Sequence, residues 1–122
     1  MTDETKDPRE GVRRIARKAL AEGRPLEWFE EAYRARAAGE VEIPWSDREP
    51  NAILVSLLGR GDSKGRRALV VGAGDGQDAL WLAGRGYRVT AFDIAPTAVA
   101  ECRARHGESG VEWEVANLLA PP

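Results

Sequence analysis

The chain has 122 residues, which is enough for one domain with a core of its own. Hydrophobic residues make up 43% and charged residues 31%, a composition typical of a globular protein and unlike that of a disordered one. The formal net charge of −2 argues against a general nucleic-acid binder, because neutralising phosphates takes a concentrated cationic surface.

The N-terminus is polar and lacks the apolar core of a signal peptide. No apolar run approaches the ~18 residues of a membrane span. The single cysteine, Cys102, excludes an internal disulfide and suits a reducing interior. We therefore expect a cytoplasmic protein with no nucleic-acid partner and no membrane partner.

The first half of the chain is predicted to be helical. Asp7 can cap a helix that starts at Pro8, and apolar residues then recur at helical spacing as far as Gly23. A second helix is expected between Pro25 and Gly39. The short apolar segment 51–59 also favours a helix over a strand, because its leucines and isoleucine follow helical spacing.

From residue 68 the pattern changes to alternating strands and helices. The apolar run 68–72 predicts a strand covered on both faces, and it is followed by a helix over 77–85. Residues 87–92 predict the second strand, and a helix from Pro96 to about residue 105 leads to an edge-type strand over 111–115. The fold class is therefore α/β: N-terminal helices followed by the first βαβαβ half of a Rossmann-like sheet.

Three glycines crowd the connection between the first strand and its helix, at Gly72, Gly74 and Gly76. Glycine permits positive φ and lets a ligand approach the backbone, while the helix N-terminus offers free N–H groups to a carboxylate or phosphate. Asp93 closes the second strand, where a carboxylate can accept hydrogen bonds from the two ribose hydroxyls of a nucleotide ligand. The loop and the acid together predict a nucleoside site.

The spacing of the glycines discriminates between cofactors. The dinucleotide fingerprint needs a third glycine at position 77, where this chain has Gln77. A helical region also precedes the first strand, whereas NAD-type binders usually start at that strand. Both differences favour S-adenosylmethionine (SAM), and they disfavour an NAD(P)-linked reductase.

At these residues the chain resembles the class I SAM-dependent methyltransferases. The stretch "ALVVGAGDGQDALWLAGRGYRVTAFDIAPTAVAECRAR" looks like their first two motifs, and "VEWEVANLL" looks like their third strand. The upstream "EVEIPWSDREPNAILVSLL" is similar to thiopurine methyltransferase-like and tellurite-resistance-like members. The resemblance implies an N-terminal helical region over residues 1–60 that covers the cofactor, and a partial Rossmann-like SAM-binding domain over residues 61–122.

The resemblance also implies the residues that contact the cofactor. The backbone of Gly72, Ala73 and Gly74 would face the methionine moiety, with Gln77 beside them at the start of the helix. Asp93 would hold the ribose. The remaining contacts are the adenine neighbours Ile94, Asn117 and Leu118, and Trp45, which would shield the cofactor from the N-terminal side.

Two positions depart from the family pattern. Many members carry an acid where this chain has Val70, which weakens the expected recognition of the methionine amino group. Many also carry aspartate where Asn117 stands, although asparagine can still accept a hydrogen bond through its carbonyl oxygen.

Other chemistry-bearing residues favour structural roles. Asp75 and Asp78 are expected to be hydrated carboxylates on the turn and the helix that follows it, with no catalytic role. His106 is expected at a helix end, where it interacts favourably with the helix dipole. Cys102 shares a helical face with apolar residues, so burial is expected. With one histidine and one cysteine, no metal site is predicted.

The resemblance implies transfer of a methyl group from SAM to a small-molecule nucleophile, with the catalytic residues unidentified. Family members continue with a fourth strand and further elements that supply most substrate contacts. Without them the first strand has one unpaired side. Three accounts stay open: a truncated enzyme, an assembly in which the exposed edge pairs with another chain, and a self-sufficient minimal module. The alternative function is a non-catalytic module that binds SAM or S-adenosylhomocysteine, or serves interaction, and pairs with another chain through the open sheet edge.

Overall fold

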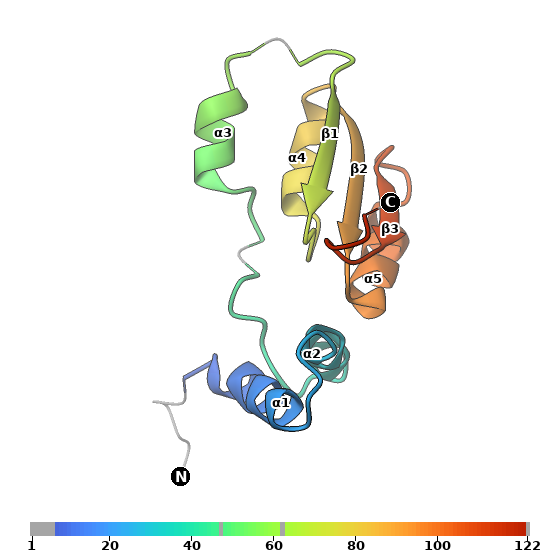
Figure 1. The fold of residues 1–122 in the computed structure, drawn as a ribbon. Coiled ribbons are helices and arrows are strands. Elements are labelled where there is room, and N and C mark those ends of the chain that lie inside the picture. The colour runs from blue at the N-terminus through green and yellow to red at the C-terminus, as the bar shows by residue number, and fades with distance from the viewer. Residues whose placement is uncertain (1–6, 47, 62, 122) are drawn as a thin grey trace. The chain divides into compact units, whose positions relative to one another are not determined.

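The computed structural model describes residues 7–46, 48–61 and 63–121. The chain divides after Ser46 into two compact units. Among these residues, the first unit holds helices α1 and α2, and the second holds the remaining helices and the three strands (Figure 1). In the part of the chain that the structure describes, no helix is both long and apolar enough to cross a bilayer.

The first unit consists of α1 (Glu10–Ala21) and α2 (Trp28–Ala37). Helix α1 begins two residues after Pro8, and α2 begins three residues after Pro25, so both start later than the prolines predict. Before α1, the side chain of Asp7 accepts a hydrogen bond from the N–H of Arg9 at 2.9 Å, so it organises the preceding turn and does not cap the helix itself. The two helices are therefore confirmed, with shifted N-terminal ends.

The second unit is a three-stranded parallel sheet with its crossover helices, preceded by a short helix. The strand order is β1-β2-β3, which confirms the βαβαβ half-sheet and the α/β fold class. The element bounds are α3 (Ala52–Leu58), β1 (Arg67–Val71), α4 (Gln77–Gly84), β2 (Arg88–Asp93), α5 (Pro96–His106) and β3 (Glu112–Val115).

The register of the sheet brings the loops after the strands together. Val71 at the end of β1 is the partner of Phe92, and Asp93 at the end of β2 is the partner of Val115. Because the carboxyl ends of parallel strands share one edge of the sheet, the loop after β1 lies beside Asp93. This edge is where ligands bind in open α/β sheets.

Helices α4 and α5 pack on one face of the sheet (Figure 1). The core beneath them is a single cluster of buried residues: Ala79, Leu82, Val89, Ala91, Val99, Cys102, Val111 and Trp113. Right-handed crossovers that run in one direction across a sheet place successive helices on the same face. Both crossovers here run from β1 toward β3, so α4 and α5 share a face.

The expectation that β1 is covered on both faces is wrong. Its side chains alternate in burial, and Leu69 and Val71 are 55% and 46% exposed. Neither α4 nor α5 covers these two side chains, because both helices lie on the opposite face. The same strand is the outer member of the sheet, with β2 as its single neighbour among the described strands.

Candidate cofactor site

The loop after β1, residues 72–76, is named here the glycine loop. Its three glycines all have positive φ, 66° at Gly72, 54° at Gly74 and 81° at Gly76, as predicted. The N–H of Gly76 donates to the carbonyl oxygen of Ala73 at 2.8 Å, which closes the turn. Gly76 is then the N-cap of α4, so the first N–H groups of that helix lie next to the loop.

Gly72 and Gly76 have opposite surroundings. A Cβ added to Gly72 would meet no heavy atom within 4 Å, so its backbone is open to a ligand. A Cβ on Gly76 would lie 2.6 Å from the ring of Trp113. The interpretation that all three glycines make room for a ligand is therefore wrong at Gly76, where the protein's own core takes the space.

Asp93 is bound to the glycine loop. One carboxylate oxygen accepts a hydrogen bond from the N–H of Gly74, and the other accepts from the N–H of Ala95, both at 2.9 Å. The residue is buried, with 7% of its surface exposed. Each oxygen keeps further acceptor capacity, because a carboxylate has about four lone-pair sites. The structure therefore brings the predicted loop and the predicted acid together.

The main chain of the loop is also paired with the sheet and with α5. The N–H of Ala73 donates to the carbonyl oxygen of Phe92 at 2.9 Å. The thiol of Cys102 donates to the carbonyl oxygen of Gly74 at 3.4 Å. Burial raises the pKa of Cys102 to about 11, with smaller contributions from nearby carboxylates such as Asp75, so the thiol keeps its proton.

Asn117 and Leu118 follow β3 at the same edge of the sheet. The side-chain oxygen of Asn117 accepts from the N–H of Leu119 at 3.0 Å, and its carbonyl oxygen accepts from the N–H of Ala120 at 2.9 Å. Leu118 is 63% exposed, and Ile94, directly after Asp93, is half-buried. Their contact with adenine stays a prediction.

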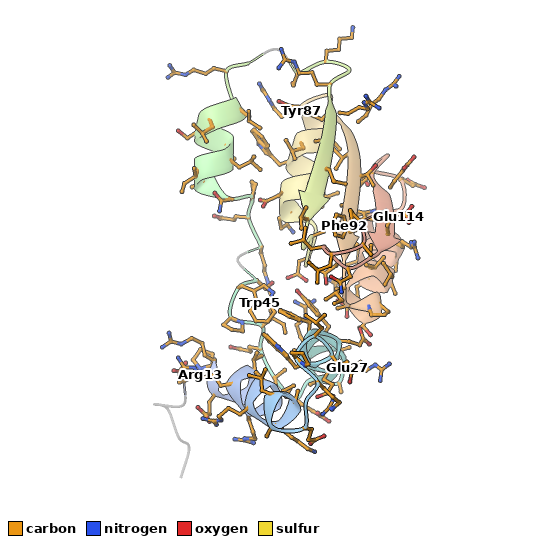
Figure 2. The ribbon with its side chains drawn as sticks, in the orientation of Figure 1. Arg13, Glu27, Trp45, Tyr87, Phe92 and Glu114 are labelled. Carbon is orange, nitrogen blue, oxygen red and sulfur yellow. The ribbon has the colours of Figure 1, made fainter. Side chains whose placement is uncertain are left out.

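Trp45 belongs to the first unit, where it lies in an aromatic cluster. Trp45 is labelled in Figure 2. Its indole N–H donates to the hydroxyl of the buried Tyr33 at 2.9 Å, and its ring contacts those of Trp28 and Phe29 edge-on. The hydrogen bond to Tyr33 fixes the orientation of the Trp45 ring. The residue is nevertheless 42% exposed, so part of the ring surface is accessible. Its role as a cofactor shield stays a prediction.

Asp78 has a role that the sequence reasoning missed. Its carboxylate accepts from the N–H of Asn51 at 2.7 Å, and the Asn51 side chain accepts from Ile53 and Leu54 as the N-cap of α3. Asp78 therefore joins the start of α3 to the first turn of α4. The signal for the cap was present, because asparagine directly before an apolar helical run is a typical helix start.

The fold and this loop define a Rossmann-like βαβαβ half-sheet with a glycine-rich turn after its first strand. Comparison with known proteins gives its family: the family model for thiopurine S-methyltransferase (TPMT) matches residues 30–117. The chain therefore belongs to the thiopurine S-methyltransferase family, a methyltransferase family, as the sequence motifs predicted.

Individual relatives agree with this assignment. A 2-heptyl-1-hydroxyquinolin-4(1H)-one methyltransferase of Mycobacteroides abscessus is 33% identical over 95 residues, which cover 74% of this chain and 41% of that protein. A structure described as "Conversion of a Disulfide Bond into a Thioacetal Group during Echinomycin Biosynthesis" is 37% identical, with a TM-score of 0.62. The match covers 75% of this chain and 39% of the chain in that structure.

A third relative is the structure of a DhpI-SAM-HEP complex. It is 32% identical with a TM-score of 0.51, over 72% of this chain and 41% of the DhpI chain. The present chain thus spans about two fifths of the length of each of these relatives.

Proposed function

We propose that the glycine loop and Asp93 bind S-adenosylmethionine, and that the protein transfers its methyl group to a small-molecule nucleophile. One observation supports this most directly. The glycine loop has an open backbone at Gly72, and the Asp93 carboxylate is held beside the same loop by its hydrogen bond from the N–H of Gly74. Family membership and a relative solved with SAM support the same cofactor.

The residues present fit this cofactor. The open backbone at Gly72 and the N-terminal turn of α4, which begins at Gln77, would receive the methionine carboxylate through N–H donors and the positive end of the helix dipole. The remaining acceptor capacity of Asp93 suits two ribose hydroxyls. Ile94 and Leu118 would offer apolar surface to adenine, and the family resemblance adds Trp45 as an aromatic side chain that would shield the cofactor.

Bound SAM supplies an electrophilic methyl group on a sulfonium. The chain's own residues would then bind and orient, because in-line placement of a nucleophile at near-attack distance supplies much of the rate. This chemistry requires no general base from the residues described above. A cytoplasmic location is part of the same proposal. So are two functional regions, residues 1–60, which would cover the cofactor, and residues 61–122, which would bind it.

One observation favours a second candidate. β1 is an outer strand whose Leu69 and Val71 are exposed, so this edge offers unpaired backbone groups beside apolar side chains. The alternative is a module that binds SAM or S-adenosylhomocysteine without turnover and pairs with another chain through β1. Light scattering of the purified chain tests it, because this alternative requires a mass above that of the monomer.

Calorimetric titration with S-adenosylhomocysteine, SAM and NADH tests the proposed cofactor. We expect binding of the first two in the micromolar range or tighter, no saturable binding of NADH, and at least a tenfold loss of affinity in Asp93→Ala. Glu114→Ala, which removes an exposed carboxylate on β3, is the matched control. Saturable NADH binding, or no S-adenosylhomocysteine binding by a folded chain, would overturn the proposal.

A further inference from the structure

We propose that Trp113 and Cys102 are positioning residues that hold the glycine loop in the conformation that binds the ligand. The inference rests on the proposed function, which supplies the ligand. The packing of Trp113 and Cys102 against the loop is present in the protein without a ligand. Trp113 comes from β3 and Cys102 from α5. Both belong to the core cluster, so they connect that cluster to the loop.

The contact at Gly76 is the main evidence. A Cβ at this position would lie 2.6 Å and 3.0 Å from Cη2 and Cζ3 of Trp113, and 3.1 Å from Sγ of Cys102. Gly76 itself is buried and has φ 81°. Its backbone therefore rests directly on both side chains, and only glycine combines that contact with that conformation.

The two supporting side chains have little freedom to move away. Trp113 is 6% exposed and Cys102 is 3% exposed. The guanidinium of Arg103 on α5 donates to the carbonyl oxygen of Trp113 at 2.5 Å, which ties β3 to α5. Close-packed interiors transmit displacement, so a change at Trp113 should reach the loop.

Cys102 adds a second contact at the other end of the turn. Its thiol donates to the carbonyl oxygen of Gly74, the residue whose N–H is bonded to Asp93. Gly74 is thus held by Asp93 through its N–H and by Cys102 through its carbonyl oxygen. The core supports the loop at Gly74 and Gly76, while the backbone of Gly72 stays open to the ligand.

A double-mutant cycle tests this arrangement. The variants are Gly76→Ala, Trp113→Phe and the double variant, each titrated with S-adenosylhomocysteine. Phenylalanine lacks the far edge of the indole, where Cη2 and Cζ3 lie. The indole N–H is buried with no partner among the described residues, so the change breaks no side-chain hydrogen bond. Strain from positive φ affects Gly76→Ala in both backgrounds and cancels in the cycle.

We expect Gly76→Ala to weaken binding about 30-fold in the wild-type background and about threefold or less in the Trp113→Phe background. Trp113→Phe alone should weaken binding about fivefold, because the loop loses its support. The matched control is Trp81→Phe, which changes a half-buried tryptophan packed against the same core. The three heavy atoms nearest a Cβ at Gly76 belong to Trp113 and Cys102. Trp81→Phe should leave the affinity within about twofold.

Equal losses in the two backgrounds would overturn the positioning role, and so would equal effects of Trp113→Phe and Trp81→Phe. Cys102→Ala is the second variant, with an expected loss of about threefold. Hydrogen exchange of the Gly74 amide gives a readout without ligand: Trp113→Phe should speed it at least fivefold, and Trp81→Phe should not. If the wild type binds no S-adenosylhomocysteine, the proposed function fails, and the exchange rates alone decide the positioning role.

Discussion

The carboxylate of Asp93 accepts a hydrogen bond from the backbone N–H of Gly74 at 2.9 Å, across the carboxyl ends of β2 and β1. The acid expected to hold a ribose is therefore also part of the frame that holds the loop. Its second oxygen is bonded to Ala95, at the start of α5. One buried side chain thus connects two strand ends and a helix.

We predict that Asp93→Ala lowers the free energy of unfolding by about 2 to 4 kcal/mol, because it leaves two buried N–H donors without their charged acceptor. Asp93→Asn should lose about half as much, since its single carbonyl oxygen can serve one of the two donors. Urea unfolding measures both. Glu114→Ala, an exposed control on β3, should stay within about 0.5 kcal/mol of wild type. A loss below 1 kcal/mol in Asp93→Ala would show that the bonds do not stabilise the fold.

The order of strands and helices followed from the sequence because apolar runs, helix caps and glycines are local signals. The half-sheet, the loop conformation and the position of Asp93 were all predictable in this way. The exposed side of β1 was not, because an apolar run such as Leu69 to Val71 does not say which elements cover it. Whether a run is buried on one face or two depends on where the crossovers place the helices.

The support of the glycine loop was also beyond the sequence. Gly76 shares its spacing and its positive φ with Gly72, so the two look alike along the chain. They differ only through Trp113, which is 37 residues further on and meets Gly76 after the sheet has formed. Contacts at such separations have no periodic signature.

The bond between Asp78 and Asn51 predicts that α3 depends on α4. Asp78→Ala should remove the acceptor of the Asn51 N–H and raise amide hydrogen exchange over Ala52–Leu58 by about fivefold. Asn51→Ala should have a similar effect by removing the cap, with a loss of about 1 kcal/mol in stability. Glu101→Ala on α5 is the control. Unchanged exchange in Asp78→Ala would mean that core packing alone holds α3.

The aromatic cluster of the first unit yields a separate prediction. Tyr33→Phe keeps the buried ring but removes the hydroxyl that accepts from the Trp45 indole at 2.9 Å. Because Trp45 is 42% exposed, water can replace that partner, and we expect a loss of no more than about 1 kcal/mol. Red-shifted tryptophan emission would report the change, with Tyr87→Phe in the second unit as the control. An unshifted spectrum would show that ring packing alone fixes Trp45.

Cys102 predicts a specific loss of stability in alkali. Burial, the largest cause, raises the pKa of the folded thiol from 9.0 to about 11, so between these values the unfolded chain releases a proton that the folded chain retains. The thiol's contribution is therefore fully present below pH 9 and is lost as the pH rises to 11, by an amount on the order of 2 kcal/mol. Cys102→Ala lacks this titration, so the stability difference between wild type and variant should narrow across that window. A constant difference from pH 8 to pH 11 would contradict the raised pKa of the buried thiol.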